Sequence, residues 1–357
     1  LLRYNERVQI DGVEVSDERL CEAFVALEAG RGETSLTYFE MGTLAAFWLF
    51  ERAQLDAVVL EVGLGGRLDA VNLVDADMAL VTSIGVDHVE YLGNTRESVA
   101  YEKAGIFRAG KPALCGDTNP PHTLLDKAGE LGCPLFVRGR DFDLASAGQV
   151  WHWHGLDAKG QAVELRDIPL LDLPMENAAL AVQAYALTDL PWQPARIISV
   201  LTGTRVTGRL DRRQFNWQGK TLNLLLDVGH NPHAAEYLAR RLALRPVAGK
   251  RLAVFGLLVD KDLDGVVSPL VSSVEHWAVA PLNTGRTRPV GEVQAALQGL
   301  QASVSAYDSV AAALEAQCER ATPADEIVLF GSFYCVAEAL EWLQRRAMEE
   351  AANGFAG

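Results

Sequence analysis

The chain has 357 residues, enough for two domains that each bury a hydrophobic core. Hydrophobic residues make up 49% of the chain and charged residues 22%, a composition that is ordinary for a globular protein in water. The formal net charge of −15 argues against sequence-independent binding of nucleic acid, which needs a basic surface. No apolar run approaches the roughly 20 residues of a membrane span, and no signal peptide opens the sequence, so no membrane partner is expected.

Cysteine usage points to a reducing compartment. The five cysteines are scattered, form no CxxC pair and are odd in number, which predicts neither a disulfide framework nor a zinc site. Reduced thiols are typical of the cytoplasm, so we expect a cytoplasmic protein. The first residue is Leu1 rather than Met, and we expect the chain to begin partway through a longer protein.

The first half of the chain predicts an α/β domain with a parallel sheet. Continuous apolar runs separated by helical stretches indicate strands that are buried on both faces. Farther along, Trp151 and Trp153 alternate with His152 and His154, which predicts a packed hairpin face rather than a metal site. The expected strands are 7–10, 56–62, 77–84, 112–116, 134–137, 150–154 and 162–165, and the expected helices are 16–27, 41–52, 176–188 and one that begins at 194.

A second series of alternating strands and helices follows a predicted boundary near residues 208–211. We therefore predict two domains, 1–208 and 209–357, both of the α/β class. The strands expected in the second domain are 221–228, 251–257, 276–280 and 326–330, and the last expected helix is 334–350.

The most informative feature is a predicted strand that ends on Glu61 and breaks at once into the glycine-rich turn 63–66. Such a strand carries its last side chain to the edge of the sheet where open α/β proteins bind ligands. The next predicted strand ends near His88, so neighbouring strands would bring Glu61 and His88 to one edge. Lys103 lies where another loop is expected to open. A carboxylate, an imidazole and a lysine at one edge suggest a metal ion and an anionic substrate.

Each of these residues also has a plainer interpretation. The glycine turn could belong to a nicotinamide-binding fold, but no helix is expected directly after it, as that fold requires. His88 could be a structural histidine, and Lys103 could pair with Glu102 on a surface helix. Against this, a buried Glu61 must be paired, neutralised or metal-bound, and a carboxylate suits magnesium. A desolvated Lys103 could lose its proton and react with carbon dioxide to give a carbamate, an oxygen ligand for a metal.

The second half repeats this pattern. An apolar strand ends on Asp227 and is followed by His230, Asn231 and a proline that is typical of a helix start. Asn231 is explained as a helix N-cap, whereas Asp227 and His230 together are harder to explain structurally. Ser332 follows another apolar strand and precedes a helix, so it could hold a carboxylate at the helix N-terminus or form an ordinary strand-to-helix turn.

Taken together, these residues resemble the folylpolyglutamate synthase/dihydrofolate synthase family, within the ATP-dependent Mur-type ligases. The similarity extends in order along almost the whole chain and is greatest to the bifunctional members of the family. The matching segments are Leu36–Glu40, Glu61–Asn72, Thr82–Ile84 with Asp87 and His88, Glu102–Phe107, Gly208 with Arg209, Asp227–Pro232, Asp260–Asp262 and Gly331–Phe333.

The resemblance implies a fold and a reaction. The fold would combine a P-loop-NTPase-like domain, the Mur ligase central domain, with a C-terminal Rossmann-like domain, and the two would close about a hinge near Gly208. ATP would phosphorylate the carboxylate of dihydropteroate or of a folate, and the amino group of L-glutamate would displace the phosphate to give an amide. Magnesium would offset the charge on the transferring phosphoryl group.

The resemblance also assigns roles to particular residues. The metal ligands would be Glu61, His88 and Lys103, with Lys103 carbamylated. The pterin pocket would be lined by Thr37, Tyr38, Phe39, Glu40 and Leu68. ATP would contact Asn177, Arg209 and Asp227, and the incoming glutamate would contact His230 and Ser332. The catalytic residues would be Lys103, Asp227 and His230.

One departure from the family pattern is large. The family begins with a P-loop, and no G-x-x-x-x-G-K-[ST] occurs in this sequence. We expect that the first domain lacks this loop and its central strand because the chain is N-terminally incomplete. Two alternatives remain open: a non-catalytic folate-binding relic, and a sibling ligase acting on a cell-wall precursor, against which segment 37–40 argues by resemblance. We expect the partners to be small molecules only, and we expect the protein to be a monomer.

Overall fold

The computed structural model describes residues 1–354, with side chains described as far as residue 349. It divides into two compact units. The first comprises Asn5–Thr204, and the second comprises the chain from Arg205 onward together with Leu1–Tyr4. Among the described residues, no helix is both long enough and apolar enough to cross a membrane.

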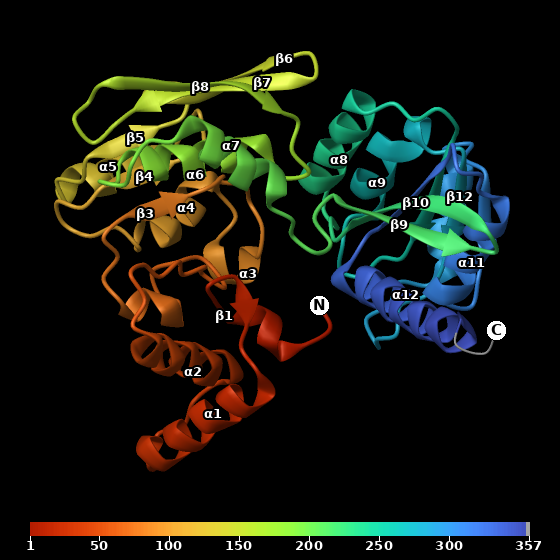
Figure 1. Cartoon of the computed structure of the whole chain (residues 1–357), viewed down its shortest axis with the longest axis horizontal. Coiled ribbons are helices and arrows are strands. Elements are labelled where there is room, and N and C mark those ends of the chain that lie inside the picture. Colours follow the sequence, from red (N-terminus) through yellow and green to blue (C-terminus); the bar gives the residue numbers. More distant parts are fainter. Residues whose placement is uncertain (355–357) are drawn as a thin grey trace. The chain divides into compact units, whose positions relative to one another are not determined.

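The first unit is built on a parallel sheet of three strands in the order β3-β4-β5 (Figure 1). A hairpin of two short strands and a separate antiparallel sheet in the order β6-β7-β8 complete its β-structure. Its elements are β1 Gln9–Ile10, β2 Val13–Glu14, α1 Asp17–Arg31, α2 Tyr38–Ala53, a 3-10 helix Ala70–Leu73, β3 Ala79–Val81, α3 Val89–Leu92, α4 Arg96–Ala104, β4 Ala113–Cys115, α5 His122–Glu130, β5 Leu135–Val137, β6 Asp143–Ala147, β7 Val150–Leu156, β8 Ala162–Pro169, α6 Met175–Ala186 and α7 Pro194–Gly203.

The central strand of the parallel sheet, β4, is buried on both faces, as its continuous apolar sequence predicts, whereas Leu80 of the edge strand β3 is exposed. Ala113 and Cys115 of β4 face a core shared with α4 and α5, while Leu114 between them faces α6 and the antiparallel sheet. Trp151 and Trp153 of β7 are fully buried in this second core, which confirms the predicted packed hairpin face. Figure 1 shows α6 lying between the two sheets.

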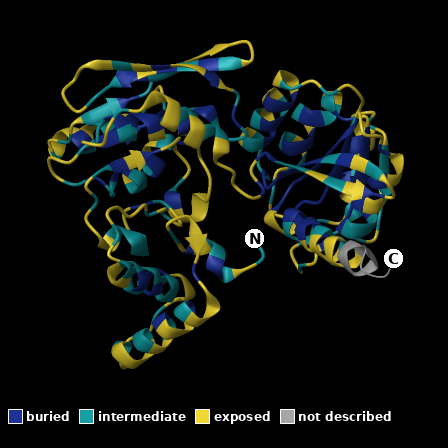
Figure 2. Cartoon of the chain, in the orientation of Figure 1, coloured by how far each residue is buried: buried dark blue, intermediate teal, exposed yellow. Residues whose placement is uncertain are grey.

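The prediction of a strand at 56–62 is wrong. This segment belongs to no strand of the structure, and Val59 is 94% exposed. Figure 2 shows the chain coloured by burial. A strand needs a hydrogen-bonded neighbour, and β3, the edge strand of the sheet, pairs only with β4 among residues 1–354. The segment is apolar, as the prediction assumed, but no described strand pairs with it.

The second unit is a mixed sheet of six strands in the order β13-β12-β11-β14-β10-β9, with helices on both faces. All neighbours are parallel except β9, an antiparallel edge strand that the sequence did not indicate. The elements are β9 Asp211–Trp217, β10 Lys220–Asp227, α8 Pro232–Leu244, β11 Arg251–Phe255, α9 Leu263–Val267, a 3-10 helix Ser268–Ser273, β12 His276–Val279, α10 Val290–Gly299, β13 Val304–Ala306, α11 Val310–Arg320, β14 Glu326–Phe330 and α12 Phe333–Gly354.

Successive side chains of the central strands point to opposite faces of the sheet and belong to two separate hydrophobic cores. Leu224 and Leu226 of β10 face α11 and α12, whereas Leu225 faces α8 and α9. Because β10 and β14 are parallel neighbours in which Asp227 is opposite Phe330, the residues that follow both strands emerge at one edge of the sheet.

Candidate functional site

The glycine-rich turn 63–66 of the first unit packs on the C-terminal end of α4. A side chain at Gly66 would place its Cβ 2.9 Å from the carbonyl oxygen of Glu102, so only glycine fits there. The next residue, Arg67, donates its backbone N–H to the same carbonyl (2.8 Å) and forms an ion pair with the Glu102 carboxylate (3.0 Å). The turn is therefore fixed to the helix that carries Lys103.

A carboxylate closes the turn from within. Asp69 accepts hydrogen bonds from the backbone N–H groups of Gly63 (2.9 Å) and Leu64 (3.0 Å) through one oxygen. Its other oxygen caps the following 3-10 helix by accepting from Val71 N (3.0 Å). Asp69 therefore organises the loop, a role that the sequence analysis did not give it.

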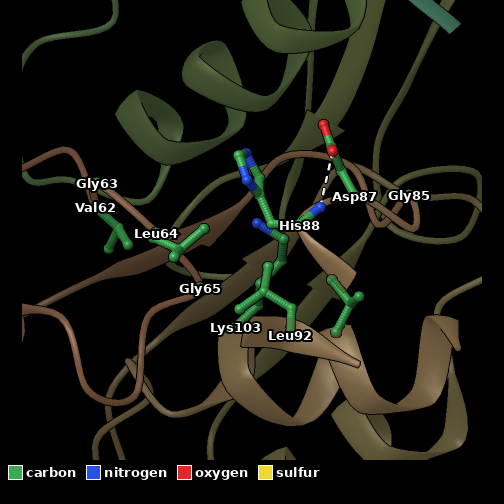
Figure 3. A pocket seen from close by; sticks show the side chains of 10 residues that line it. Val62, Gly63, Leu64, Gly65, Gly85, Asp87, His88, Leu92 and Lys103 are labelled. Atoms are coloured by element: carbon green, nitrogen blue, oxygen red, sulfur yellow. Dashed lines mark hydrogen bonds between the residues drawn. The ribbon is translucent and has the colours of Figure 1, made fainter. Parts of the chain in front are cut away.

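A pocket of about 240 Å³ opens beside this turn (Figure 3). Lys103 reaches into it from the last turn of α4, and His88 enters from the N-cap of α3. The helix replaces the loop that was expected to open around Lys103. Glu61 is exposed and does not line the pocket, although Val62 beside it does. Two of the three predicted ligands thus share one pocket, and the third lies just outside its lining.

Asp87 is a pocket residue to which the sequence analysis gave no role. Its carboxylate accepts the backbone N–H of His88 (2.8 Å), drawn as a dashed line in Figure 3. An acid directly before a candidate histidine at a strand end was the signal available in the sequence.

Lys103 is half-buried, and its side chain forms no hydrogen bond or ion pair with the described residues. The neighbouring carboxylate of Glu102 is engaged by Arg67. Burial lowers the pKa of the Lys103 ammonium from its ordinary value. The amine of Lys103 is therefore easier to deprotonate than that of an exposed lysine.

The pocket was also predicted to bind a metal. Within residues 1–354, no group of three His, Cys, Asp or Glu side chains lies close enough together to hold one. Asp87 and His88 supply two donors, and magnesium retains several water ligands. An ammonium at Lys103 would repel a divalent cation, whereas a carbamate would add an anionic oxygen donor. The residues therefore fit a magnesium ion only when Lys103 is carboxylated.

A second hollow of about 380 Å³ contains part of the predicted pterin site. Glu40 and Leu68 line it, whereas Thr37 and the 70% exposed Tyr38 do not. Phe39 packs on the glycine turn, since a Cβ at Gly63 would lie 2.7 Å from its ring. The lining residues are Glu40, Thr43, Leu44, Arg67, Leu68, Asp69, Ala70, Asn72 and Leu73.

Thr37 is the N-cap of α2. Its hydroxyl accepts from Glu40 N (3.2 Å), and the Glu40 carboxylate accepts from Thr37 N (2.7 Å), a complete capping box. These bonds lower the pKa of the Glu40 carboxyl, which therefore stays ionised at neutral pH.

The variant Thr37→Ala is expected to lower the free energy of unfolding of the first unit by about 1 kcal/mol, because one helix N–H loses its acceptor. Urea unfolding followed by hydrogen exchange in α2 measures the change, and Thr37→Ser, which keeps the cap, should remain near wild type. Equal stability of the alanine and serine variants would show that the cap is unimportant.

In the second unit, Asp227 is buried at the end of β10. Its two oxygens accept from the backbone N–H groups of Leu210 (3.0 Å) and Gly229 (2.8 Å). Burial raises the pKa of the Asp227 carboxyl, although these hydrogen bonds and the nearby charges of Arg209 and His230 oppose the rise. The carboxylate thus ties the strand end to the chain at residue 210.

Arg209 and His230 flank one aromatic ring, that of Phe333. The Arg209 guanidinium lies 5.8 Å from the ring centre, and the His230 ring centre lies 6.1 Å away. The Nδ1–H of His230 donates to the Val228 carbonyl (2.9 Å), because a carbonyl can only accept. A neutral His230 therefore leaves Nε2 as the acceptor. No role had been assigned to Phe333 from the sequence.

The other predicted residues of the second unit, and Asn177 of the first unit, have plainer structural surroundings. Ser332 is buried, and its hydroxyl accepts from Cys335 N (2.9 Å) at the start of α12, which is the ordinary turn that the sequence left open. Asn177 is exposed in the first turn of α6, in the first unit. Asn231 is the predicted N-cap of α8, with its side chain accepting from Ala234 N (2.9 Å).

Asp227→Asn is expected to remove a pH dependence of stability. Folding raises the pKa of this carboxyl above 3.8, so protons bind more readily to the folded state. The free energy of unfolding of the wild type relative to the variant should therefore be highest below pH 3.8 and fall as pH rises from there through the folded-state pKa. The slope in that window is at most about 1.4 kcal/mol per pH unit. Urea unfolding of both proteins between pH 4 and 8 measures it, and parallel curves would contradict it.

Comparison with known proteins gives consistent results for both units. Residues 17–128 match the model of the Mur ligase middle domain, and residues 208–333 match that of the Mur ligase glutamate ligase domain. The dihydrofolate synthase/folylpolyglutamate synthase of Escherichia coli is 42% identical over 346 residues, covering 97% of this chain and 79% of the relative. That of Haemophilus influenzae is 40% identical, covering 95% of this chain and 79% of the relative.

Solved structures of the same kind of enzyme are also similar to this chain. Escherichia coli FolC in complex with DHPP and ADP has a TM-score of 0.87 at 40% identity, covering 97% of this chain and 80% of that one. The Yersinia pestis bifunctional folylpolyglutamate synthase/dihydrofolate synthase complexed with AMPPNP and Mn ion has a TM-score of 0.86 at 41% identity, covering 96% and 80%. The chain thus spans about four fifths of the length of these relatives.

Proposed function

Because the chain belongs to the dihydrofolate synthase/folylpolyglutamate synthase family, we propose that it joins L-glutamate to dihydropteroate and to folates at the expense of ATP. The carboxylate is first phosphorylated, and the glutamate amine then displaces phosphate from the acyl phosphate, leaving an amide. The observation that supports this most directly is the pocket in which the unpartnered Lys103 lies with His88 and Asp87 beside the glycine turn.

In the first unit, we assign Lys103 and His88, with Glu61 beside the pocket, to the magnesium ion that accompanies ATP. The lowered pKa of Lys103 favours the neutral amine, which attacks carbon dioxide and loses a proton to give a carbamate. Bound magnesium supplies charge neutralisation at the phosphoryl group. Gly63, Leu64 and Gly65 of the glycine turn line the same pocket.

The second hollow is assigned to the pterin. Leu68, 78% exposed at its rim, can cover an apolar ring. Glu40 remains ionised and can accept hydrogen bonds from ring N–H groups. Thr37, Tyr38 and Phe39 place Glu40 by starting α2 and packing on the turn.

In the second unit, Arg209 is assigned to the phosphates of ATP because its guanidinium is exposed and stacked on Phe333. Asp227 holds the strand end to which His230 is attached. As the family resemblance implies, we also assign a nucleotide contact to Asp227 and, separately, one to Asn177 of the first unit. Nε2 of His230, the nitrogen left as an acceptor, can take a proton from the glutamate ammonium as the amine attacks. Ser332 fixes the start of α12 beside it.

The test is ADP release by the intact protein supplied with ATP, magnesium and L-glutamate, with dihydropteroate, tetrahydrofolate or a cell-wall precursor as the acid. Release that requires both glutamate and a pteridine acid supports the proposal. Release with the cell-wall precursor alone would identify a sibling ligase. Tight folate binding without ADP release would identify a non-catalytic relic.

We also propose that the protein acts as a cytoplasmic monomer. No membrane-spanning helix occurs among the described residues, and the ligands named for the related structures are small molecules. Light scattering across a range of concentrations tests the monomer, and a mass that doubles with concentration would contradict it.

A further inference from the structure

The segment that carries His88 leaves the sheet before it reaches the pocket. At the end of β3, the backbone N–H of Gly116, which follows β4, donates a hydrogen bond to the carbonyl of Val81 (2.8 Å). The chain then continues to His88, which adopts a left-handed conformation with φ of +50°. Such a conformation costs energy in a residue with a side chain and persists only where the surroundings impose it.

An ion pair holds this segment at Ile84. Nε of Arg96 donates to the Ile84 carbonyl (3.0 Å), and Asp117 Oδ2 accepts from the Ile84 amide (3.3 Å). Nη2 of Arg96 donates to the same Asp117 oxygen (2.6 Å), while Asp117 Oδ1 accepts from Asn119 N (2.9 Å). Two side chains therefore satisfy both backbone groups of Ile84 where the sheet no longer does.

The helix that supplies Arg96 also supplies the lysine of the pocket. Arg96 is the first residue of α4, and Lys103 follows seven residues later, close to two helical turns and thus on the same face. Ile84 is buried in the same core as Val99 of this helix. Neither Arg96 nor Asp117 lines the pocket.

We infer that Arg96 and Asp117 are a positioning pair that sets where His88 lies relative to Lys103. The inference rests on the proposed function for the chemical role of those two pocket residues. The pair acts through the backbone of residues 82–88 and contacts neither the pocket nor its ligands. A displacement of reacting groups by about 1 Å can cost on the order of 100-fold in rate, so a pair outside the pocket can control turnover.

The variants Arg96→Gln and Asp117→Asn test the pair. Each is expected to lower kcat for ADP release by about 10- to 100-fold while changing KM for glutamate less than about 3-fold. The double variant should be no slower than the slower single variant, because the two side chains act as a unit. Arg96→Lys keeps the charge but lacks the planar fork whose Nε and Nη2 bind Ile84 and Asp117, so it should resemble Arg96→Gln.

Hydrogen exchange supplies a measurement that does not depend on ligase activity. Exchange in residues 82–88 should rise at least about 10-fold in both single variants and stay unchanged in β4. The matched control is Lys111→Gln, which breaks an exposed ion pair with Asp77 (2.8 Å) in the same unit and should leave both kcat and exchange as in wild type.

The outcomes separate the two proposals. Unchanged hydrogen exchange in residues 82–88 would show that the positioning pair does not hold this segment. Faster exchange with a normal kcat would show that the pair holds the segment but does not control turnover. A fall in kcat that only follows the fraction of unfolded protein would also show that the pair does not control turnover. If the wild type releases no ADP, the proposed function fails, while exchange at residues 82–88 still decides whether the pair holds the segment.

Discussion

Replacing Lys103 by alanine is expected to lower turnover by at least about 100-fold without unfolding the protein. Removing one preorganised charged or polar group from a reaction centre typically costs about 10²–10³ in kcat. The side chain supports no other structure, because no hydrogen bond or ion pair joins it to the rest of the described chain. Its loss should also relieve the cost of burying an amine, so stability should stay equal or rise.

The measurement is kcat for ADP release together with thermal unfolding, for Lys103→Ala, Lys103→Arg and the control Lys111→Ala. Arginine keeps the positive charge but cannot form a carbamate, so Lys103→Arg should be as slow as the alanine variant. Carbon-13 NMR after addition of labelled bicarbonate should show a carbamate signal in wild type that Lys103→Ala lacks. Normal turnover of either Lys103 variant would exclude the lysine from the reaction.

Periodicity and end signals predicted most of the elements. Ser16 begins α1, and Asn231 with its following proline begins α8, as predicted. The helix expected at 41–52 begins earlier, at Tyr38, because Thr37 caps it. The strand predicted at 77–84 was found as β3, shorter than expected because residues beyond Val81 bond to side chains instead of a neighbouring strand. The prediction of a strand at 56–62 was wrong for a related reason. An apolar pattern indicates that a segment tends to be buried, but it does not show whether a neighbouring strand is present to pair with it.

The candidate site was predicted only in part. Lys103 and His88 share a pocket because the last turn of α4 and the start of α3 both border it. The roles of Asp69, Arg96 and Asp117 were not found, because each acts through contacts to backbone groups that leave no local pattern in the sequence. Their partners can be recognised only when the path of the chain is known.

The largest effect on stability is expected for Glu326→Ala in the second unit. Glu326 is buried at the start of β14 and accepts hydrogen bonds from two arginines, Arg212 of β9 and Arg251 of β11 (2.9 Å for Arg251). Arg251 is itself 90% buried, with its side chain only 10% exposed. Removing the shared carboxylate leaves two cations close together without their counter-ion, which costs about 3–5 kcal/mol.

Hydrogen exchange of β10, β11 and β14 reports this change, and the strands β3–β5 of the first unit serve as the internal control in the same sample. A loss of about 3–5 kcal/mol corresponds to a fall in unfolding temperature of roughly 10 °C for a unit of this size. Glu275→Ala, which breaks the exposed pair of Glu275 with Lys250 (2.6 Å), should change stability by less than about 1 kcal/mol. Glu326→Gln keeps the shape of the side chain and one acceptor but not the charge, so it should lie between the two. If Glu326→Ala were no worse than Glu275→Ala, water or neighbouring carbonyls would be sufficient for both arginines, and the carboxylate would not stabilise this sheet.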